Sequence, residues 1–418
     1  MSQTLPPSED RLTALDLIRG IAVLGVLLAN LTHFCGPQIQ SWAQMPRQDQ
    51  WVAAMIRLLV DAKFITMLAI LFGAGLAIQH DRARAQGKPF VIPYLWRQFL
   101  LYLLGISHVI FLWYGDILAT YALVSAFVLL VVYLGPAWEK GVMAFGLAWV
   151  YTGMALIFLV MLAFSLFGPQ GEAPKLIPYP SEVEGPPIKV WENVQQYFEP
   201  TNQIRIFRNG TFGDQVVFRI IFHLASLLVL PIFLIWYLGT CFLIGVQLIR
   251  LGAFEPTTRP PWVFNDFVTL GLWVGIPLHL LSVVWGLWMP ASFLPGILHF
   301  AGALPQALLY LSLLVWWNES NILPGLQARF RAVGRMALTN YLMQSVLCVL
   351  VFNNFGLNFY GTTGLLGGLV VVAAIWTLEM IWSPLWLSVF HMGPIEWVWR
   401  SLVAFRPMPI FKRKGVPT

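Results

Sequence analysis

Apolar runs recur along the whole chain, and several approach or exceed the roughly 20 residues that a helix needs to cross a bilayer. A bilayer core offers no water to backbone amides, so a crossing segment is either a helix or a strand of a closed barrel. The runs are continuous rather than alternating, which favours helices. Because 58% of the residues are apolar and only 11% are charged, against about 25% in soluble domains, we predict an all-α, polytopic transmembrane helix bundle.

Run lengths and breaker residues predict about ten spans. Segment 48–61 is amphipathic, and we expect it to lie along the membrane interface before the second span. The run 214–250 contains Pro231 and is too long for one simple crossing, so an eleventh span is the alternative. The predicted spans are 17–34, 62–79, 95–114, 117–134, 141–167, 228–250, 267–286, 295–317, 334–354 and 365–390.

The distribution of basic residues predicts the topology. With the N-terminus in the cytoplasm, most of the 25 Lys and Arg residues fall in cytoplasmic segments, which satisfies the positive-inside rule. Both termini are then cytoplasmic, and the number of spans is even. We predict a single transmembrane domain, with a five-span half over 1–167, an extracytoplasmic loop over 168–215 and a second half over 216–418.

Several function classes lack their usual motifs. The chain has no GxxxxGK[ST], GxGxxG, HExxH or GxSxG pattern. Its three cysteines, Cys35, Cys241 and Cys348, are far apart and show no metal-ligand spacing, so no metal site is expected. The net charge of +6 sits mostly at span ends and in the tail, so we interpret it as topology information and expect no nucleic-acid partner.

Ionisable side chains inside predicted spans are costly, so each is a candidate for function. In the first span, Arg19 and Asn30 are eleven positions apart, which places both on one helix face about 16 Å apart. Asp16 can pair with Arg19 from position i−3. The structural alternatives are an ordinary interfacial ion pair for Asp16 and Arg19, and an interhelical hydrogen bond for Asn30.

The third span repeats the spacing, since Arg97 and His108 are also eleven positions apart. Histidine titrates near neutrality and can act as a general base. Asp116 follows a predicted turn, where it either caps the next helix or orients His108, the latter only if the turn folds back. Tyr121 is another possible partner of His108. The structural alternative is a histidine that bonds to a neighbouring helix.

Arg335 marks the cytoplasmic end of the ninth span, and Asn340 and Gln344 share one of its faces at positions i and i+4. These amides predict either interhelical hydrogen bonds or a polar cavity. Glu379 lies deep in the tenth span and needs a partner. We interpret the remaining charged residues near the last turn as interfacial anchors: His391, Glu396 and Arg400.

Together these motifs resemble the YeiB-like family of bacterial inner-membrane proteins, over nearly the whole chain. The matching stretches are 15–30 ("LDLIRGIAVLGVLLAN"), 72–79 ("FGAGLAIQ"), 103–124 ("LLGISHVIFLWYGDILATYALV"), 333–345 ("VGRMALTNYLMQS") and 393–400 ("GPIEWVWR"). The family is distantly similar to membrane-embedded acyltransferases, namely the acyltransferase 3 and heparan-α-glucosaminide N-acetyltransferase groups. Arg19 matches an arginine that both groups carry. Asn30 matches the asparagine of the second group and stands where the first has a histidine.

The resemblance implies an acyltransferase of the bacterial cytoplasmic membrane. An acyl-CoA-like donor would bind from the cytoplasm, and an envelope, lipid or sugar acceptor would arrive from the outer side. The expectation requires His108 and the arginines to line one hydrated cavity. The alternatives are a transporter of a small anionic or zwitterionic molecule and a non-catalytic membrane partner protein; a homodimer is possible. The expected catalytic pair is His108 and Asp116, and the expected binding residues are Asp16, Arg19, Asn30, Arg97, Tyr121, Arg335, Asn340 and Gln344.

Overall fold

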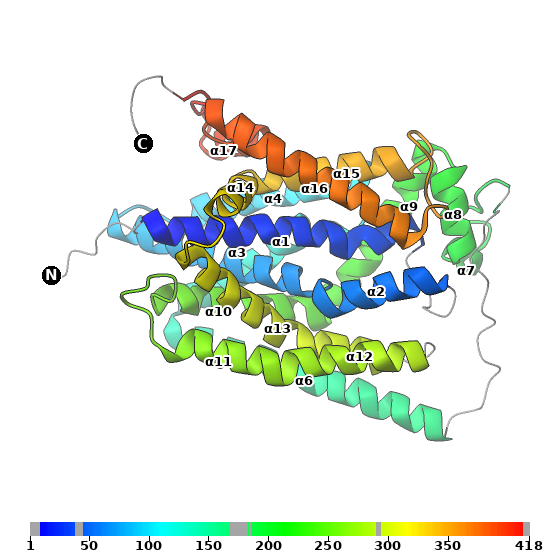
Figure 1. Cartoon of the computed structure of the whole chain (residues 1–418), viewed down its shortest axis with the longest axis horizontal. Coiled ribbons are helices and arrows are strands. Elements are labelled where there is room, and N and C mark those ends of the chain that lie inside the picture. The colour runs from blue at the N-terminus through cyan, green and yellow to red at the C-terminus, as the bar shows by residue number, and fades with distance from the viewer. Residues whose placement is uncertain (1–8, 38–44, 168–182, 184, 290–293, 413–418) are drawn as a thin grey trace.

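The computed structural model describes residues 9–37, 45–167, 183, 185–289 and 294–412. Across these residues the chain is built from helices, and its β-structure consists of one isolated bridge between Phe390 and Phe411. The predicted all-α class is therefore confirmed. Figure 1 shows the long helices running roughly parallel to one another as one bundle.

The helices follow one another in this order: α1 (Glu9–Cys35), α2 (Arg47–Leu59), α3 (Lys63–Ala85), α4 (Val91–Phe111), α5 (Leu118–Leu134), α6 (Pro136–Phe167), α7 (Val194–Tyr197), α8 (Pro200–Arg208), α9 (Phe212–Val229), η2 (Leu230–Leu234), α10 (Ile235–Arg250), α11 (Trp262–Leu270), η3 (Gly271–Gly275), α12 (Ile276–Trp288), α13 (Leu294–Glu319), α14 (Pro324–Arg335), α15 (Ala337–Phe352), α16 (Gly364–Val389) and α17 (Pro394–Val403). The elements η2 and η3 are π-helical turns.

Each of the ten predicted spans overlaps a helix. Seven helical segments of the described chain are long and apolar enough to cross a membrane, or eight if α14 and α15, which meet at a bend of 83°, form one span. The start of α1 and helix α17 lie at one end of the bundle, and α7 and α8 lie at the other (Figure 1). This placement agrees with an even number of crossings, whereas the count of ten and the cytoplasmic side stay predictions.

Glycine allows α3 and α10 to pack backbone against backbone. A Cβ at Gly73 would lie 1.8 Å from the carbonyl oxygen of Phe242, and one at Gly245 would lie 1.9 Å from that of Ile70. Both distances are far shorter than van der Waals contact, so neither position accepts a side chain without separation of the helices. Small residues at such positions are typical of membrane helix pairs.

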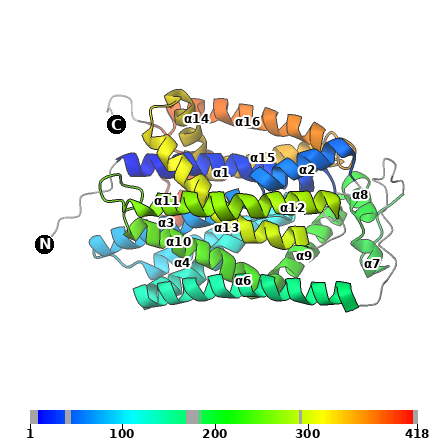
Figure 2. The same cartoon turned by 60° about the horizontal axis from the view of Figure 1, so that its bottom comes forward.

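Helix α2 differs from the prediction. It runs beside α1 rather than across the end of the bundle (Figures 1 and 2), and its outward face carries Trp51, Met55 and Leu59. Ala62, in the left-handed conformation with φ of 63°, separates it from α3. Three side chains donate hydrogen bonds to the last carbonyl oxygens of α2. Lys63 donates to the carbonyl oxygen of Arg57. From α13, Gln306 donates to the carbonyl oxygen of Leu58 at 3.0 Å, and Tyr310 donates to the carbonyl oxygen of Leu59 at 2.9 Å. The break therefore has its polar backbone groups satisfied inside the bundle.

The run from α9 to α10 is a helical stretch with a π-helical turn at Leu230–Leu234, the position of Pro231. Arg219 of α9 is fully buried and donates hydrogen bonds to the carbonyl oxygens of Ile110 and Phe111, at 3.3 and 3.2 Å. These are the last carbonyls of α4, which lack intrahelical partners. Arg219 therefore fixes the end of the helix that carries His108.

Candidate functional site

A cavity of about 280 Å³ lies between α1, α3, α4, α5, α14, α15 and α17, towards the end of the bundle that carries α17 (Figure 1). Four arginines from four different helices line it: Arg19 of α1, Arg97 of α4, Arg335 of α14 and Arg400 of α17. The three arginines that were predicted to bind a ligand together do lie in one cavity. Arg400, which the sequence analysis interpreted as an interfacial anchor, joins them in the lining.

Close helix packing brings two of these arginines together. A Cβ at Gly20 would lie 2.0 Å from the carbonyl oxygen of Phe330, and one at Gly334 would lie 1.9 Å from that of Asp16. Helices α1 and α14 therefore cross with their backbones in contact. Since Arg19 and Arg335 are the neighbours of these glycines in sequence, the crossing sets both guanidinium groups at the cavity.

The arginine charge of the cavity exceeds the acidic charge beside it. Arg19 pairs with Asp16 at 3.0 Å, as the i−3 spacing predicted. Arg97 lies 3.9 Å over the ring of Trp399, and Arg335 donates to the carbonyl oxygen of His391 at 3.2 Å. Among the described residues, Arg19 is the only one of the four that forms an ion pair. The cavity consequently has a positive potential that attracts anions.

One acid, Glu396, also lines the cavity, but its carboxylate is engaged by the start of α15. It accepts hydrogen bonds from the backbone amides of Leu338 and Thr339, at 2.7 and 3.1 Å, and from the hydroxyl group of Thr339. These are orphan donors of the first helical turn, so Glu396 caps the helix. Together with Asp16 its carboxylate offsets only part of the charge of the four arginines, and the cavity keeps a net positive charge.

The polarity of the cavity falls with depth. Arg335 and Arg400 are exposed, Arg19 and Arg97 are partly buried, and the tyrosines Tyr94, Tyr121 and Tyr341 are buried. The hydroxyl group of Tyr121 donates to the carbonyl oxygen of Ile65 at 2.5 Å, so this residue is not a partner of His108. Gln98 is buried in the same lining, and its side-chain oxygen has no hydrogen-bond partner among the described residues.

Behind Tyr341 lies a hydrogen-bonded row of a serine, a histidine and an aspartate. His108 Nδ1 lies 3.0 Å from Asp116 Oδ1, and His108 Nε2 lies 2.8 Å from Ser345 Oγ. The side chains of His108 and Asp116 have no exposed surface, and Ser345 is buried. A nucleophile, a base and an orienting acid in this order form the arrangement that activates a hydroxyl group in acyl transfer.

The turn after α4 does fold back, because Gly105 leaves room for it. A Cβ at Gly105 would lie 2.4 Å from the backbone nitrogen of Ala119 and 2.7 Å from Asp116 Oδ2. The two carboxylate oxygens of Asp116 then divide the two roles that the sequence left open. Oδ2 accepts a hydrogen bond from the amide of Ala119 at 2.7 Å and caps α5, and Oδ1 bonds His108.

Tyr341 separates His108 from the arginines. Its ring lines the cavity and packs against the imidazole with 5.1 Å between centroids, and its hydroxyl oxygen lies 3.4 Å from Asp116 Oδ1. His108 is not part of the cavity lining. The expectation that the imidazole and the arginines share one hydrated chamber was therefore wrong for this conformation; one aromatic side chain divides them.

The other predicted site residues lie elsewhere. Asn340 donates to the carbonyl oxygen of Val333 and to Ser383 Oγ, and Gln344 donates to Glu379 Oε2 at 2.9 Å. These are the interhelical hydrogen bonds that the sequence left as one alternative. Asn30 is not in the cavity lining.

Sequence reasoning missed Ser345, Gln98 and the part that Arg400 plays. Ser345 follows the noted amides and lies one turn beyond Tyr341, but its partner His108 is 237 positions away. No local pattern reports such a pair.

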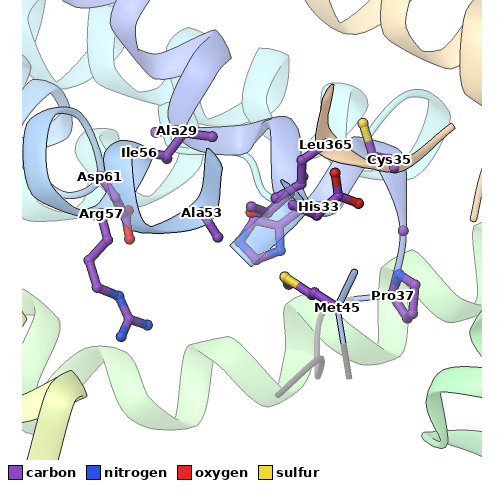
Figure 3. A pocket seen from close by; sticks show the side chains of 14 residues that line it. Ala29, His33, Cys35, Pro37, Met45, Ala53, Ile56, Arg57, Asp61 and Leu365 are labelled. Atoms are coloured by element: carbon purple, nitrogen blue, oxygen red, sulfur yellow. The ribbon is translucent and has the colours of Figure 1, made fainter. Parts of the chain in front are cut away.

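A second cavity, of about 170 Å³, lies between the end of α1, α2 and the start of α16, at the opposite end of the bundle. Figure 3 shows the imidazole of His33 pointing into it beside Ala53. Asp61, at the break after α2, also lines it and bonds His299 Nε2 at 3.1 Å. In the described part of the chain, no group of three or more His, Cys, Asp and Glu side chains is placed to hold a metal ion.

The fold and the cavity define a polytopic helical membrane protein with an arginine-lined cavity towards one end. The chain belongs to the YeiB-like family. It is 30% identical, over 94% of its length and 96% of the relative, to "Uncharacterized protein YeiB" of Escherichia coli (strain K12). It is 28% identical to "Uncharacterized protein YxaH" of Bacillus subtilis (strain 168), over 98% of both chains. Residues 248–406 match the family described as "Protein of unknown function (DUF418)". No solved structure matches the chain.

Proposed function

We propose that the protein is an integral acyltransferase of the bacterial cytoplasmic membrane. It takes an acyl group from a cytoplasmic acyl-CoA-like donor and transfers it to a lipid, sugar or other envelope acceptor. The observation that carries the proposal is a cavity lined by four arginines and by Tyr341, whose ring lies directly against the buried row of Ser345, His108 and Asp116.

Arginine is suited to phosphate, because its planar guanidinium donates two parallel hydrogen bonds to the oxygens. A CoA-type donor carries several phosphates on a nucleotide, and a long amide-containing arm leads from them to the thioester. In the proposal, Arg335 and Arg400, which are exposed, bind the phosphates at the outer end of the cavity, and the partly buried Arg97 contacts the donor further in. The unpartnered side-chain oxygen of Gln98 can accept a hydrogen bond from an amide of the arm.

The size of the cavity also supports a donor whose nucleotide stays outside and whose arm enters the cavity. At about 280 Å³ it is at the lower limit of ordinary small-molecule sites, which begin near 300 Å³. It can therefore hold an extended arm but not a whole dinucleotide-sized cofactor. The donor would leave its nucleotide at the mouth and direct the acyl group towards Tyr341.

His108 supplies the base. With Nδ1 protonated and donating to Asp116, Nε2 carries the lone pair that removes a proton from a hydroxyl group. Asp116 holds the ring in this tautomer and stabilises the imidazolium that forms. The shared cavity that the sequence expectation required is not open in this conformation, so the proposal adds one condition: Tyr341 must move before a thioester can reach the row.

Equilibrium binding of an acyl-CoA to the purified protein in nanodiscs tests the donor. Loss of a charged hydrogen bond costs about 1.5–3 kcal/mol, so Arg97→Gln and Arg335→Gln should each raise the Kd roughly 10- to 150-fold. The matched control is Arg259→Gln, because Arg259 pairs with Glu319 outside the cavity. Absence of saturable binding, or an equal loss in the control, would refute the donor.

Transfer of radiolabel from acyl-CoA to total membrane lipids and glycans tests the reaction. His108→Ala should abolish transfer while it leaves donor binding intact, because the imidazole lies behind the cavity and not in its lining. Undiminished transfer by His108→Ala would remove the assignment of the base.

A transporter of a small anionic or zwitterionic molecule is the second candidate, and the break between α2 and α3 favours it. Broken helices with ionisable groups at the break are typical of transport sites. Here Asp61 bonds His299, and fully buried Lys63 bonds the end of α2. This function predicts uptake or efflux in sealed vesicles that Asp61→Asn reduces, without covalent change to the substrate.

A further inference from the structure

We propose that Ser345 is the nucleophile of the transfer, so that the acyl group passes through a serine ester before it reaches the acceptor. The inference rests on the proposed function for the identity of the donor. It adds a residue and a covalent intermediate to that function. The observation behind it is the pair of hydrogen bonds, 2.8 and 3.0 Å long, that link Ser345 Oγ, the two ring nitrogens of His108 and Asp116 Oδ1.

The direction of these hydrogen bonds is the one that the proposed reaction requires, with Asp116 ionised and His108 neutral. An ionised carboxylate only accepts, so His108 Nδ1 carries the proton that bonds Asp116. Nε2 of the neutral ring is then an acceptor, and the hydroxyl group of Ser345 donates to it. This is the orientation in which an imidazole removes the proton of an attacking hydroxyl group. The alternative acceptor, the carbonyl oxygen of Tyr341, is more distant, at 3.4 Å.

The position of Ser345 on α15 links the row to the cavity. Tyr341 lies one helical turn before Ser345, so both side chains lie on the same face of the helix. Tyr341 lines the cavity, and Ser345 lies behind it against His108. If the tyrosine side chain rotates away, the next polar group that an acyl donor meets along this helix face is the hydroxyl group of Ser345.

The chemical steps balance without a further reactant. Ser345 Oγ attacks the thioester carbonyl carbon while its proton moves to His108 Nε2. The carbon–sulfur bond breaks, the CoA thiolate leaves and takes the proton from His108, and an acyl-serine ester results. An acceptor hydroxyl group then attacks this ester, His108 takes its proton, and Ser345 Oγ regains that proton as the product leaves.

A small fluorophosphonate probe tests the nucleophile without any acyl-CoA. The probe should label the protein once, and peptide mass spectrometry should place the label on Ser345. Labelling should be at least 10-fold faster in Tyr341→Ala, in which the dividing side chain is absent, and should disappear in the doubles Tyr341→Ala/Ser345→Ala and Tyr341→Ala/His108→Ala. Ser312→Ala is the matched control: Ser312 is a buried serine on α13 that donates to the carbonyl oxygen of Leu308, so its loss should leave labelling unchanged.

Acid quenching after incubation with radiolabelled acyl-CoA, without acceptor, tests the intermediate. We expect one acyl group per chain on the Ser345 peptide, which alkaline hydroxylamine releases and neutral hydroxylamine does not, as for an oxygen ester. Ser345→Ala should lower overall transfer by on the order of 1,000-fold or more.

The two proposals fail in different ways. Label transfer that survives in Ser345→Ala would overturn the nucleophile and leave the acyltransferase standing. Absence of fluorophosphonate labelling in Tyr341→Ala would also overturn the nucleophile. Labelling of Ser345 without saturable acyl-CoA binding would support the nucleophile and refute the donor.

Discussion

The crossing of α1 and α14 provides a sharp test of how packing builds the arginine cavity. In Gly334→Ala, the new methyl group would lie 1.9 Å from the carbonyl oxygen of Asp16, whereas ordinary contact begins at 3.4 Å. The obstacle is backbone, so it cannot rotate away, and the two helices must separate locally by about 1.5 Å. Overpacking of this kind costs about 1–3 kcal/mol of unfolding free energy.

The displacement also changes the site, because Arg19 and Arg335 lie on the two helices that move apart. We therefore expect Gly334→Ala to weaken acyl-CoA binding by several-fold as well as to lower stability. Reversible unfolding in mixed micelles and equilibrium binding in nanodiscs measure the two effects.

Gly325→Ala is the matched control, since it lies on the same helix and its added methyl group would meet nothing within 4 Å. Alanine has the higher helix propensity, so the control should be neutral or slightly stabilising. Equal behaviour of the two variants, in stability or in binding, would refute the packing argument.

Three further predictions concern other parts of the molecule. Gly105→Ala should push Asp116 away from His108 and lower transfer at least 10-fold, measured as initial rates, while donor binding persists; an unchanged rate would contradict the fold-back of the turn. Arg219→Met leaves two of the last carbonyls of α4 unpaired, and it should lower the free energy of unfolding by about 1–3 kcal/mol for each carbonyl. An unchanged free energy of unfolding would mean that water replaces the guanidinium group. Burial raises the pKa of Asp214, but hydrogen bonds, first from Lys189, outweigh it and hold this pKa below its ordinary value. The ionised contact between Lys189 and Asp214 therefore stabilises the attachment of the segment around Lys189 to α9 above about pH 4, and this stabilisation is lost as pH falls further. A spin label near Lys189 should gain mobility below about pH 4, and at every pH in Asp214→Asn.

The helices and part of the site were predictable because their signals are local. Continuous apolar runs determine helices in a bilayer whatever their partners are. The eleven-residue spacing from Arg97 to His108 needs only the geometry of one helix. The charge of Arg19, Arg97 and Arg335 near span ends likewise indicated which residues meet at one end of the bundle.

The rest depends on tertiary packing that no local pattern encodes. Ser345 and His108 meet only because α4 and α15 are neighbours in the bundle. Asp116 can fold back because Gly105 has no side chain. The sequence shows this glycine, but it does not show that Asp116 lies against it. From the sequence alone, the helix before the break between α2 and α3 is interpreted as interfacial. The hydrogen bonds that hold the break inside the bundle come from Gln306 and Tyr310 of a distant helix, which no local pattern shows.

A structure of the protein with a non-cleavable thioether analogue of acyl-CoA is the most direct measurement of the central claim. We predict phosphate oxygens within hydrogen-bond distance of Arg335 or Arg400, the arm along Gln98, and the acyl carbon beside Ser345 with Tyr341 rotated out of its present position. Two results would contradict the account: an analogue that at saturating concentration binds elsewhere on the protein, or an arginine cavity that stays empty in a preparation that shows transfer activity.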